Sequence, residues 1–445
     1  MKSKQISIIG LGYVGLCTAI GFAHKGYTVI GIEKDLEKIV SINEGKPPFY
    51  EPRLEILLKN VIKKGYFSAF SNVETAIKKT NVTFVTVGTP SNTDGSINLK
   101  QIKKSAIDIG KALKKKDDYH LMVVKSTVVP GTTENIFKPL LEEYSSKTCG
   151  SDFGLCMNPE FLREGSAVYD AQNPDRIVIG EYDKKSGDML QTLYQGLFEK
   201  EPPIIRTNLP TAELIKYANN AFLATKISYI NCISNICEKI IGADVSVIAA
   251  GIGLDQRINP HFLNAGLGYG GSCFPKDVKA IIAFSTKLGY RPILLESTHI
   301  VNEEQAKNAV EKAKKNLKEL KGKAIAILGL AFKPDTDDMR EARSIPIINQ
   351  LLREGAKITA YDPVAIPTAK SIFGNKINYA TSAINCLRDS DCCILVTEWN
   401  EFKQLKPDDF KQHMRQPILI DGRRIYNPTE YRKKLKFEAI GLGIA

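Results

Sequence analysis

The stretch Gln5-Ile-Ser-Ile-Ile-Gly-Leu-Gly-Tyr-Val-Gly15 decides the fold of the first part of this chain. An apolar run leads directly into glycines at positions 10, 12 and 15, an amphipathic helix follows through Ala23, and a second apolar run, Thr28–Ile32, ends at Glu33. In this order the first glycine permits a tight turn, the second lets a pyrophosphate approach the backbone, and the third lets the helix pack on the strand. The pattern predicts a dinucleotide-binding sheet.

The cofactor expected in this sheet is NAD. Glu33 lies where a carboxylate would bind the hydroxyls of an adenosine ribose, which favours NAD over NADP. Two further buried strands, Val82–Val87 and Leu121–Lys125, end in small polar residues at the edge of the sheet where ligands bind. Plain turn chemistry remains an alternative reading of those residues. The expected cofactor contacts are Gly10, Gly12, Tyr13, Val14, Gly15, Glu33, Lys38, Thr89, Pro90, Ser126 and Thr127.

Length, charge and amino-acid composition exclude several classes of protein. The chain has 445 residues and is 43% hydrophobic, which predicts two or three domains with ample core. Its net charge of +12 suits anionic ligands, but no nucleic-acid-binding motif accompanies it. Nine cysteines without a CxxC pair indicate a reducing compartment, and five histidines without ligand spacing predict no metal. No apolar run approaches the roughly 20 residues that span a bilayer, and Lys4 leads straight into a strand. We therefore expect a cytoplasmic protein without a signal peptide.

The order of elements predicts an α/β fold. Strands continue at residues 175–180 and 204–205, a long helix is expected from Thr211 to about Ala250, and a second series of strands occupies 324–328, 357–361, 392–396 and 418–420. Another helix is expected from Met339 to Glu354. We predict two Rossmann-like, doubly wound parallel-sheet domains joined by a long central helix and an all-helical middle domain. The boundaries are 1–205, 206–320 and 321–445.

A glycine-rich stretch from Gly266 to Asp277 carries a candidate nucleophile. Its four glycines bring the backbone close to a ligand, and Cys273 follows with Lys276 nearby. A cation beside a thiol favours the thiolate, which is the nucleophilic form. The alternative is an ordinary buried cysteine in a surface loop.

Two pairs of polar residues have helical spacing. Glu160 and Glu164 share a face if their segment is helical, and Lys216 and Asn220 do so on the long helix. Solvated faces are the plain alternative. If these groups meet Cys273 and Thr127 at the cofactor, a thiolate can capture an aldehyde and lose hydride, which leaves a thioester. A carboxylate such as Glu160 can then activate water, while Lys216 and Asn220 stabilise oxyanions.

At this point the chain resembles a known family. The motifs NPEFLREG (158–165), LIKYANNAFLATKISYIN (214–231), GLGYGGSCFPKD (266–277) and AFKPDTDDMREA (331–342) are similar to those of the UDP-glucose/GDP-mannose dehydrogenases. The resemblance covers essentially the whole chain. It implies a four-electron oxidation of the C6 alcohol of UDP-glucose to UDP-glucuronate with two NAD⁺, without release of the aldehyde, in polysaccharide biosynthesis.

The resemblance also implies individual roles. Cys273 is the nucleophile of the second step, Glu160 handles the hydrolytic water, Lys216 and Asn220 stabilise oxyanions, and Asp277 and Thr127 assist through a water network. Glu164, Lys276 and Arg340 join the cofactor contacts. The implied substrate contacts are Glu160, Phe161, Leu162, Arg163, Glu164, Lys216, Asn220, Arg257, Phe262, Asn264, Gly268, Tyr269, Gly270, Phe332, Lys333 and Arg423. Arg257 can reach a neighbouring subunit, which implies a homodimer or higher oligomer.

Three alternatives stay open from the sequence. The substrate could be GDP-mannose or a UDP-N-acetylhexosamine instead of UDP-glucose. A two-electron dehydrogenase of the 6-phosphogluconate type shares the glycine turn and the Lys-xxx-Asn helix, but it gives Cys273 no role. A non-enzymatic NAD-binding scaffold or redox sensor would turn over no sugar nucleotide.

Overall fold

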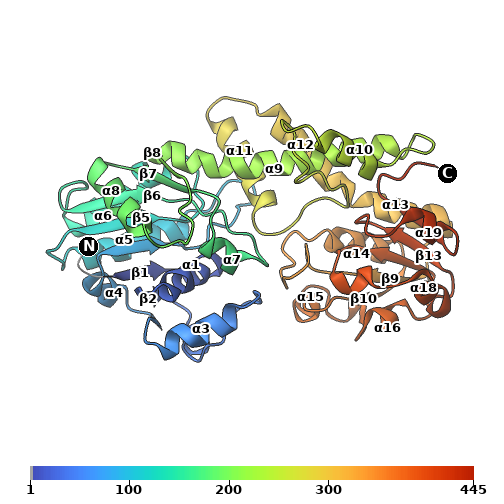
Figure 1. Ribbon diagram of the computed structural model, residues 1–445, viewed down its shortest axis with the longest axis horizontal. Helices are drawn as coiled ribbons and strands as arrows, with labels where there is room; N and C mark the ends of the chain where they lie inside the picture. The colour runs from blue at the N-terminus through green and yellow to red at the C-terminus, as the bar shows by residue number, and fades with distance from the viewer. Residues whose placement is uncertain (1–3, 445) are drawn as a thin grey trace. The chain divides into compact units, whose positions relative to one another are not determined.

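The computed structural model describes residues 4–444, which divide between Asn219 and Asn220 into two compact units. Each unit contains one β-sheet covered by helices (Figure 1). The boundary between the units falls inside a single long helix, α9 Leu209–Cys237.

The first unit is built on an eight-stranded sheet with the order β3-β2-β1-β4-β5-β6-β7-β8. Neighbouring strands are parallel except for β6 and β7, which are antiparallel. The first six strands have the order 3-2-1-4-5-6 of dinucleotide-binding sheets. The strands are β1 Gln5–Ile9, β2 Thr28–Ile32, β3 Phe67–Phe70, β4 Val82–Val85, β5 His120–Val124, β6 Phe153–Met157, β7 Ile177–Glu181 and β8 Ile204–Asn208.

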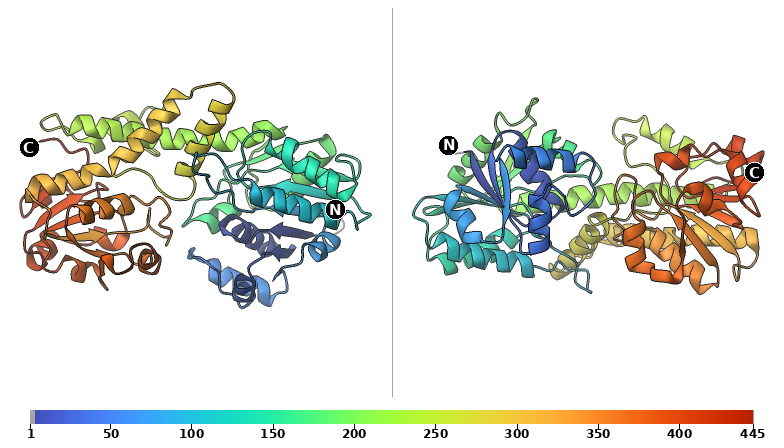
Figure 2. Two further views of the ribbon diagram at one scale, coloured as in Figure 1. Left: turned by 180° about the vertical axis from the view of Figure 1, so that it is seen from behind. Right: turned by 90° about the horizontal axis from the view of Figure 1, so that it is seen from below.

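Helices cover both faces of this sheet because its strands are apolar on both faces (Figure 2). Ile6 and Ile8 of β1 belong to a core cluster with residues of α1, α3 and α8, whereas Ile9 belongs to a second cluster with residues of α5 and α6. The helices are α1 Tyr13–His24, α2 Leu36–Asn43, α3 Leu54–Lys63, α4 Val73–Lys79, α5 Lys100–Leu113, α6 Lys138–Ser145, α7 Ala167–Gln172 and α8 Lys184–Tyr194, with a π-helical turn at Thr133–Phe137.

The second unit begins with helices and ends with a six-stranded, all-parallel sheet of order β11-β10-β9-β12-β13-β14. Numbered from its own first strand, this sheet repeats the order 3-2-1-4-5-6. Its strands are β9 Ala324–Leu328, β10 Lys357–Tyr361, β11 Asn378–Tyr379, β12 Cys392–Leu395, β13 Ile418–Asp421 and β14 Lys436–Ala439. Its helices are α10 Val245–Gly253, α11 Phe274–Lys287, α12 Ile293–Gln305, α13 Lys307–Leu317, α14 Ser344–Arg353, α15 Ile366–Phe373, α16 Ala383–Leu387, α17 Asn400–Lys403, α18 Pro407–His413 and α19 Pro428–Arg432, with a 3₁₀ turn at Gly374–Lys376. The predicted fold class is confirmed.

A carboxylate fastens the first turn of each sheet. Gly10 follows β1 with φ +94°, and the next amide, that of Leu11, donates to Glu33 Oε2 at 3.2 Å. Gly329 follows β9 with φ +96°, and the amide of Leu330 donates to Asp362 Oδ2 at 2.8 Å.

The two carboxylates differ in how many donors surround them. Glu33 is half-buried and accepts from three backbone amides. Asp362 is 1% exposed and accepts five hydrogen bonds, one of them from the indole of Trp399 at 3.1 Å. The helix that follows also differs, because α1 begins three residues after Gly10 and α14 begins fifteen residues after Gly329.

Three expected helices differ from the structure. The helix expected to run to Ala250 ends at Cys237, because Gly242 takes φ +74° and the Asp244 side chain starts α10 by accepting from the amide of Ser246 at 2.8 Å. The helix expected from Met339 begins at Ser344, since Glu341 has φ +52°. The segment from Glu160 to Glu164 is irregular, so these two glutamates do not share a helix face.

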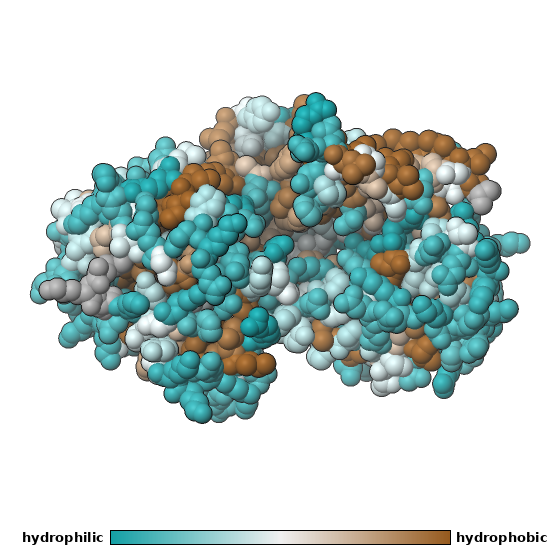
Figure 3. Space-filling model, viewed as in Figure 1, coloured by the Kyte–Doolittle hydropathy of each residue, from teal (hydrophilic) through white to brown (hydrophobic). Residues whose placement is uncertain are grey.

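The helices of the second unit expose apolar side chains. Phe222, Tyr229 and Ile236 of α9 recur every seven residues and are 66%, 52% and 52% exposed. Val247 and Leu254, in and just after α10, are 70% and 86% exposed. Apolar side chains accordingly gather over α10 in Figure 3. In residues 4–444 no helix combines the length and apolar character required to span a bilayer.

Candidate active site

The turn between β1 and α1 is shaped for a diphosphate. A Cβ at Gly15 would lie 1.8 Å from the carbonyl oxygen of Gly10, so only glycine lets α1 pack this closely on the turn. A Cβ at Gly12 would meet no atom within 4 Å, so the backbone there borders open space. No side chain caps α1 at Gly12, and its first amides remain for a ligand. These features fit the pyrophosphate of a dinucleotide.

The remaining expected cofactor positions lie in the first unit, except Lys276 and Arg340, which belong to the second. Glu33 is fastened to the turn, and Lys38 is an exposed residue of α2 whose Nζ lies 4.0 Å from an oxygen of Asp35. The loops that follow β4 and β5 are tied together, because Thr89 Oγ1 donates to the carbonyl of Thr127 at 2.8 Å. The carboxyl ends of these strands therefore form one fixed edge.

A buried ion pair lies at the carboxyl end of β6. Lys216 Nζ is 3.0 Å from Glu160 Oε1, and both side chains are almost fully buried. The other carboxylate oxygen of Glu160 accepts from the amide of Leu162 at 2.6 Å. Burial alone raises the pKa of Glu160, but the Lys216 ammonium, the Leu162 amide and the charge of Lys125 outweigh it, so the net pKa is lowered. Glu160 is therefore held as a carboxylate.

Two residues beside this pair were not predicted as site residues. Lys125, the residue after β5, is 8% exposed, and its Nζ donates to Asn158 Oδ1 at 2.9 Å. Burial lowers the pKa of Lys125 to about 8, because the nearby Glu160 only partly offsets the loss of hydration. The sequence did not single out Lys125, because a lysine at the end of a strand is usually solvated.

Phe161 and Arg163, which follow Glu160 in the same loop, make contacts with different residues. The Arg176 guanidinium stacks 3.6 Å from the centroid of the Phe161 ring, and Lys216 Nζ lies 5.3 Å from the same centroid. Arg163 instead pairs with Asp170 at 2.6 Å, with 62% of its side chain exposed.

In the second unit, Cys273 sits at the start of α11. It is partly buried, directly precedes the helix, and its Sγ lies 3.5 Å from the hydroxyl of Ser272. The amino end of this fourteen-residue helix carries partial positive charge, which favours a thiolate. Asp277 is 1% exposed in the first turn of α11, where it accepts from Asn220 Nδ2 at 2.6 Å and from Lys276 Nζ.

The glycines before Cys273 are required by close neighbours. A Cβ at Gly268, where φ is +95°, would lie 2.8 Å from Asn302 Oδ1. A Cβ at Gly270 would lie 2.4 Å from the carbonyl oxygen of Glu341, and one at Gly271 would lie 2.7 Å from the Phe332 ring. The backbone that leads to Cys273 is therefore closely packed at these three glycines.

Other residues of the second unit that were expected to contact the substrate or, in the case of Arg340, the cofactor border this loop to different degrees. Arg423 donates to the carbonyl of Gly268 at 3.3 Å, and the carbonyl of Arg340 accepts from the amide of Gly271 at 2.9 Å. The Phe262 ring is 6.2 Å from that of Phe274, the residue after Cys273. Arg257 is not part of this cluster, because its side chain is 89% exposed and pairs with Asp255.

The remaining expected positions lie on the same segments. Glu164 and Leu162 follow Glu160 in its loop, Asn264 is an exposed residue before the glycines, Tyr269 is buried between them, and Lys333 follows Phe332. Among residues 4–444 no group of three or more metal-ligating side chains could hold an ion.

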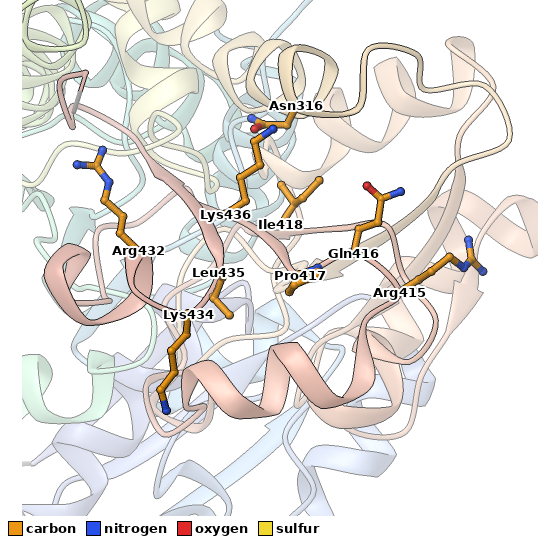
Figure 4. Close-up of a pocket in the computed structure, with 9 residues that line it drawn as sticks. All are labelled: Asn316, Arg415, Gln416, Pro417, Ile418, Arg432, Lys434, Leu435 and Lys436. Carbon is orange, nitrogen blue, oxygen red and sulfur yellow. The ribbon is translucent and has the colours of Figure 1, made fainter.

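A hollow of ≈ 430 Å³ in the second unit lies away from this loop (Figure 4). It is at the amino ends of β13 and β14, whereas Arg423 follows the carboxyl end of β13. Figure 4 shows Arg415 and Lys434 pointing away from each other. Each is paired with an aspartate, at 3.0 and 2.7 Å, so the charges of these two residues are already matched.

Comparison with known proteins shows the family. Three models of the UDP-glucose/GDP-mannose dehydrogenase family match in order: the NAD binding domain at residues 4–198, the central domain at 210–304 and the UDP binding domain at 326–428. The UDP-glucose 6-dehydrogenase of Haloferax volcanii is 44% identical over 96% of this chain and 98% of its own length. The UDP-glucose 6-dehydrogenase TuaD of Bacillus subtilis is 41% identical over 96% of this chain and 90% of its own.

Solved structures agree with this assignment. A UDP-glucose dehydrogenase from Pyrobaculum islandicum superposes with a TM-score of 0.92 at 36% identity, covering 99% of this chain and 98% of that one. A UDP-D-ManNAc dehydrogenase from Pyrococcus horikoshii gives 0.87 at 27% identity, covering 98% and 99%. The protein is thus an oxidoreductase with NAD as its cofactor, and the chain belongs to the UDP-glucose/GDP-mannose dehydrogenase family.

Proposed function

We propose that this protein oxidises the C6 alcohol of UDP-glucose to the carboxylate of UDP-glucuronate in two NAD-dependent steps. Family membership and relatives named UDP-glucose 6-dehydrogenase at 38–44% identity support the substrate. The match of residues 326–428 to a UDP binding domain supports the nucleotide. NAD, when bound, accepts one hydride in each step.

The first step needs a group that takes the alcohol proton. Lys216 and Asn220 are the proposed groups that hold the developing oxyanion, and the Glu160 carboxylate beside Lys216 is the proposed acceptor of the proton directly or through water. Its partners hold Glu160 in the anionic form that can accept a proton, and because they lower its pKa they also make it a weaker base.

The second step needs a nucleophile, and the position of Cys273 at the amino end of α11 is the observation that carries the four-electron assignment. In the proposed step the thiolate adds to the C6 carbonyl and forms a thiohemiacetal, which loses hydride and becomes a thioester. Water activated by Glu160 then releases the carboxylate and regenerates the thiol. Thr127 and Asp277 are proposed to position that water.

The ligand contacts remain proposals. We assign NAD to the residues of the glycine turn, the loops after β4 and β5, Glu164, Lys276 and Arg340. We assign the UDP-sugar to residues 160–164, Lys216, Asn220, Arg257, Phe262, Asn264, residues 268–270, Phe332, Lys333 and Arg423. Functionally, residues 1–205, 206–320 and 321–445 are then the NAD-binding, central and UDP-sugar-binding parts.

We further propose a homodimer or higher homo-oligomer whose interface includes α9 and α10. The seven-residue recurrence of Phe222, Tyr229 and Ile236 gives one apolar stripe along a helix, which fits a symmetric contact with a second copy. In this assembly Arg257 reaches the neighbouring subunit. Sedimentation of the Phe222→Glu/Tyr229→Glu variant should give a monomer, and an unchanged mass would exclude this interface.

A cytoplasmic location is proposed because all nine cysteines are free thiols, as in reducing compartments. UDP-glucuronate made there would serve polysaccharide biosynthesis.

The test is the number of NADH molecules formed per sugar nucleotide, measured with UDP-glucose, GDP-mannose and UDP-N-acetylhexosamines. We expect two NADH per UDP-glucose and the fastest turnover on it. Cys273→Ser should abolish steady-state turnover, whereas the control Cys232→Ser, which changes an exposed thiol, should retain it. One NADH per UDP-glucose, or an active Cys273→Ser variant, would refute the four-electron reaction. Fastest turnover on another sugar nucleotide would reassign the substrate.

A further inference from the structure

A second buried cation stands beside the Glu160–Lys216 pair. Lys125 is 8% exposed, and its ammonium forms no ion pair within residues 4–444. Lysine is almost never this buried without a carboxylate partner, because the loss of hydration is costly. Lys116 is buried to a similar degree, also without an ion pair among the described residues, so burial alone does not distinguish Lys125; its charge beside Glu160 does.

Asn158 links Lys125 to the loop that carries Glu160. Its Oδ1 accepts from Lys125 Nζ at 2.9 Å and from the Tyr194 hydroxyl at 2.6 Å. Its Nδ2 donates to the carbonyl of Val178 at 2.8 Å. With these three bonds the side chain is fixed, and Glu160 follows two residues later.

The charges that face Glu160 come from four parts of the first unit. Lys216 approaches from α9 and Lys125 from the end of β5, and both favour the anionic carboxylate. Cys17 approaches from α1 as a neutral thiol, because burial and the charge of Glu160 raise its pKa. Glu164 lies in the same loop as Glu160 and adds negative charge near Cys17. The charges of the two lysines therefore oppose the effect of burial, which by itself would raise the pKa of Glu160.

We infer that Lys125 is a positioning residue for the reaction, which holds Glu160 ionised by its charge and holds the Glu160 loop in place through Asn158. This inference rests on the proposed function for the role of Glu160 as base. Lys216 alone could pair with Glu160, but it is also the proposed oxyanion donor. A second cation keeps the carboxylate ionised while Lys216 interacts with substrate oxygen.

The first test is the pH dependence of kcat for UDP-glucose oxidation by the full chain. Lys125→Met keeps the apolar length and removes the charge, so the acidic limb of the profile should move upward by about one pH unit. Asn158→Asp keeps Lys125 but offsets its charge, and should move the limb in the same direction.

Lys116→Met is the matched control. Lys116 is also a buried lysine of the first unit, 6% exposed, and its Nζ donates to the carbonyl of Ile77 at 2.9 Å. It should lose stability like any buried lysine variant and leave the acidic limb in place. Equal shifts in the Lys116 and Lys125 variants, or no shift in Lys125→Met and Asn158→Asp, would overturn the inference.

The second test needs no turnover. Thermal unfolding at pH 7 is compared for Lys125→Met, Glu160→Gln and the double variant. If Lys125 stabilises ionised Glu160, Lys125→Met should lower Tm less in the Glu160→Gln background than in the wild type. Additive changes in Tm would overturn the inference while leaving the reaction intact. A wild-type chain that does not oxidise UDP-glucose would instead refute the proposed function, and the unfolding comparison would still decide the role of Lys125.

Discussion

Adding one methyl group at Gly15 or at Gly12 should separate the two roles of the glycine turn. At Gly15 the new carbon would lie 1.8 Å from the Gly10 carbonyl oxygen and 2.7 Å from Thr86 Oγ1, well inside van der Waals contact. The helix must move away from the strand, and overpacking of this kind costs about 1–3 kcal/mol of unfolding free energy. For a unit of this size each kcal/mol lowers Tm by about 2–4 °C.

At Gly12 the same methyl group meets no protein atom within 4 Å, so the fold should be unaffected. It does occupy the space that a pyrophosphate would approach, so we expect NAD affinity to fall by about 10-fold or more, a loss of ~1.4 kcal/mol. Gly15→Ala should lose both stability and affinity.

The measurements are thermal unfolding without ligand and NAD titration by calorimetry on each variant. Gly26→Ala is a control, because its Cβ also meets no atom within 4 Å, although its φ of +83° will cost some stability. It should bind NAD like the wild type. A Gly12→Ala variant with unchanged NAD affinity, or a Gly15→Ala variant as stable as the wild type, would contradict the reasoning.

Three further substitutions should each change stability or activity in a stated direction. Breaking the buried pair with Lys216→Met should cost about 3–5 kcal/mol and most of the activity while NAD still binds, and adding Glu160→Gln should recover part of the stability; wild-type turnover would exclude Lys216 from the mechanism. Burial raises the pKa of Glu213 from 4.5 to about 7, so its folded form binds the proton more tightly and stability should fall as pH rises from 4.5 to 7. Glu213→Gln should flatten denaturant-measured stability across that window, and an unchanged slope would count against the assignment. Burial lowers the pKa of His120 from 6.5 to about 3, so stability should fall as pH drops below 6.5, and the loss should be smaller in His120→Gln; an equal loss would mean that other groups cause it.

The parts of the fold that could be predicted are those fixed by local chemistry. Gly10 takes a positive φ, and Gly15 lies against a carbonyl, so both positions require glycine whatever surrounds them. Apolar strands followed by small polar residues likewise predicted the edge of the sheet at which ligands bind. The break between α9 and α10 also had a local signal, because Gly242 and Asp244 are typical of a helix end and a helix start.

The parts that could not be predicted depend on partners far apart in the chain. Lys125 and Asn158 are 33 residues apart and meet only because β5 and β6 are neighbours in the sheet. Glu213 lies near the start of α9, where acidic side chains are common, but it is fully buried and accepts from the amides of Gly131 and Thr133. Nothing in the residues around Glu213 indicates that Thr133, 80 residues earlier in the chain, hydrogen-bonds to its carboxylate.

The indole that donates to Asp362 belongs to Trp399, which is the only tryptophan of the chain. It is 8% exposed and lies among the core residues on one face of the second sheet. The intrinsic tryptophan fluorescence of the protein therefore reports on the second unit. Fluorescence should respond when that half melts or takes up a nucleotide, and should be nearly silent to events confined to the other half.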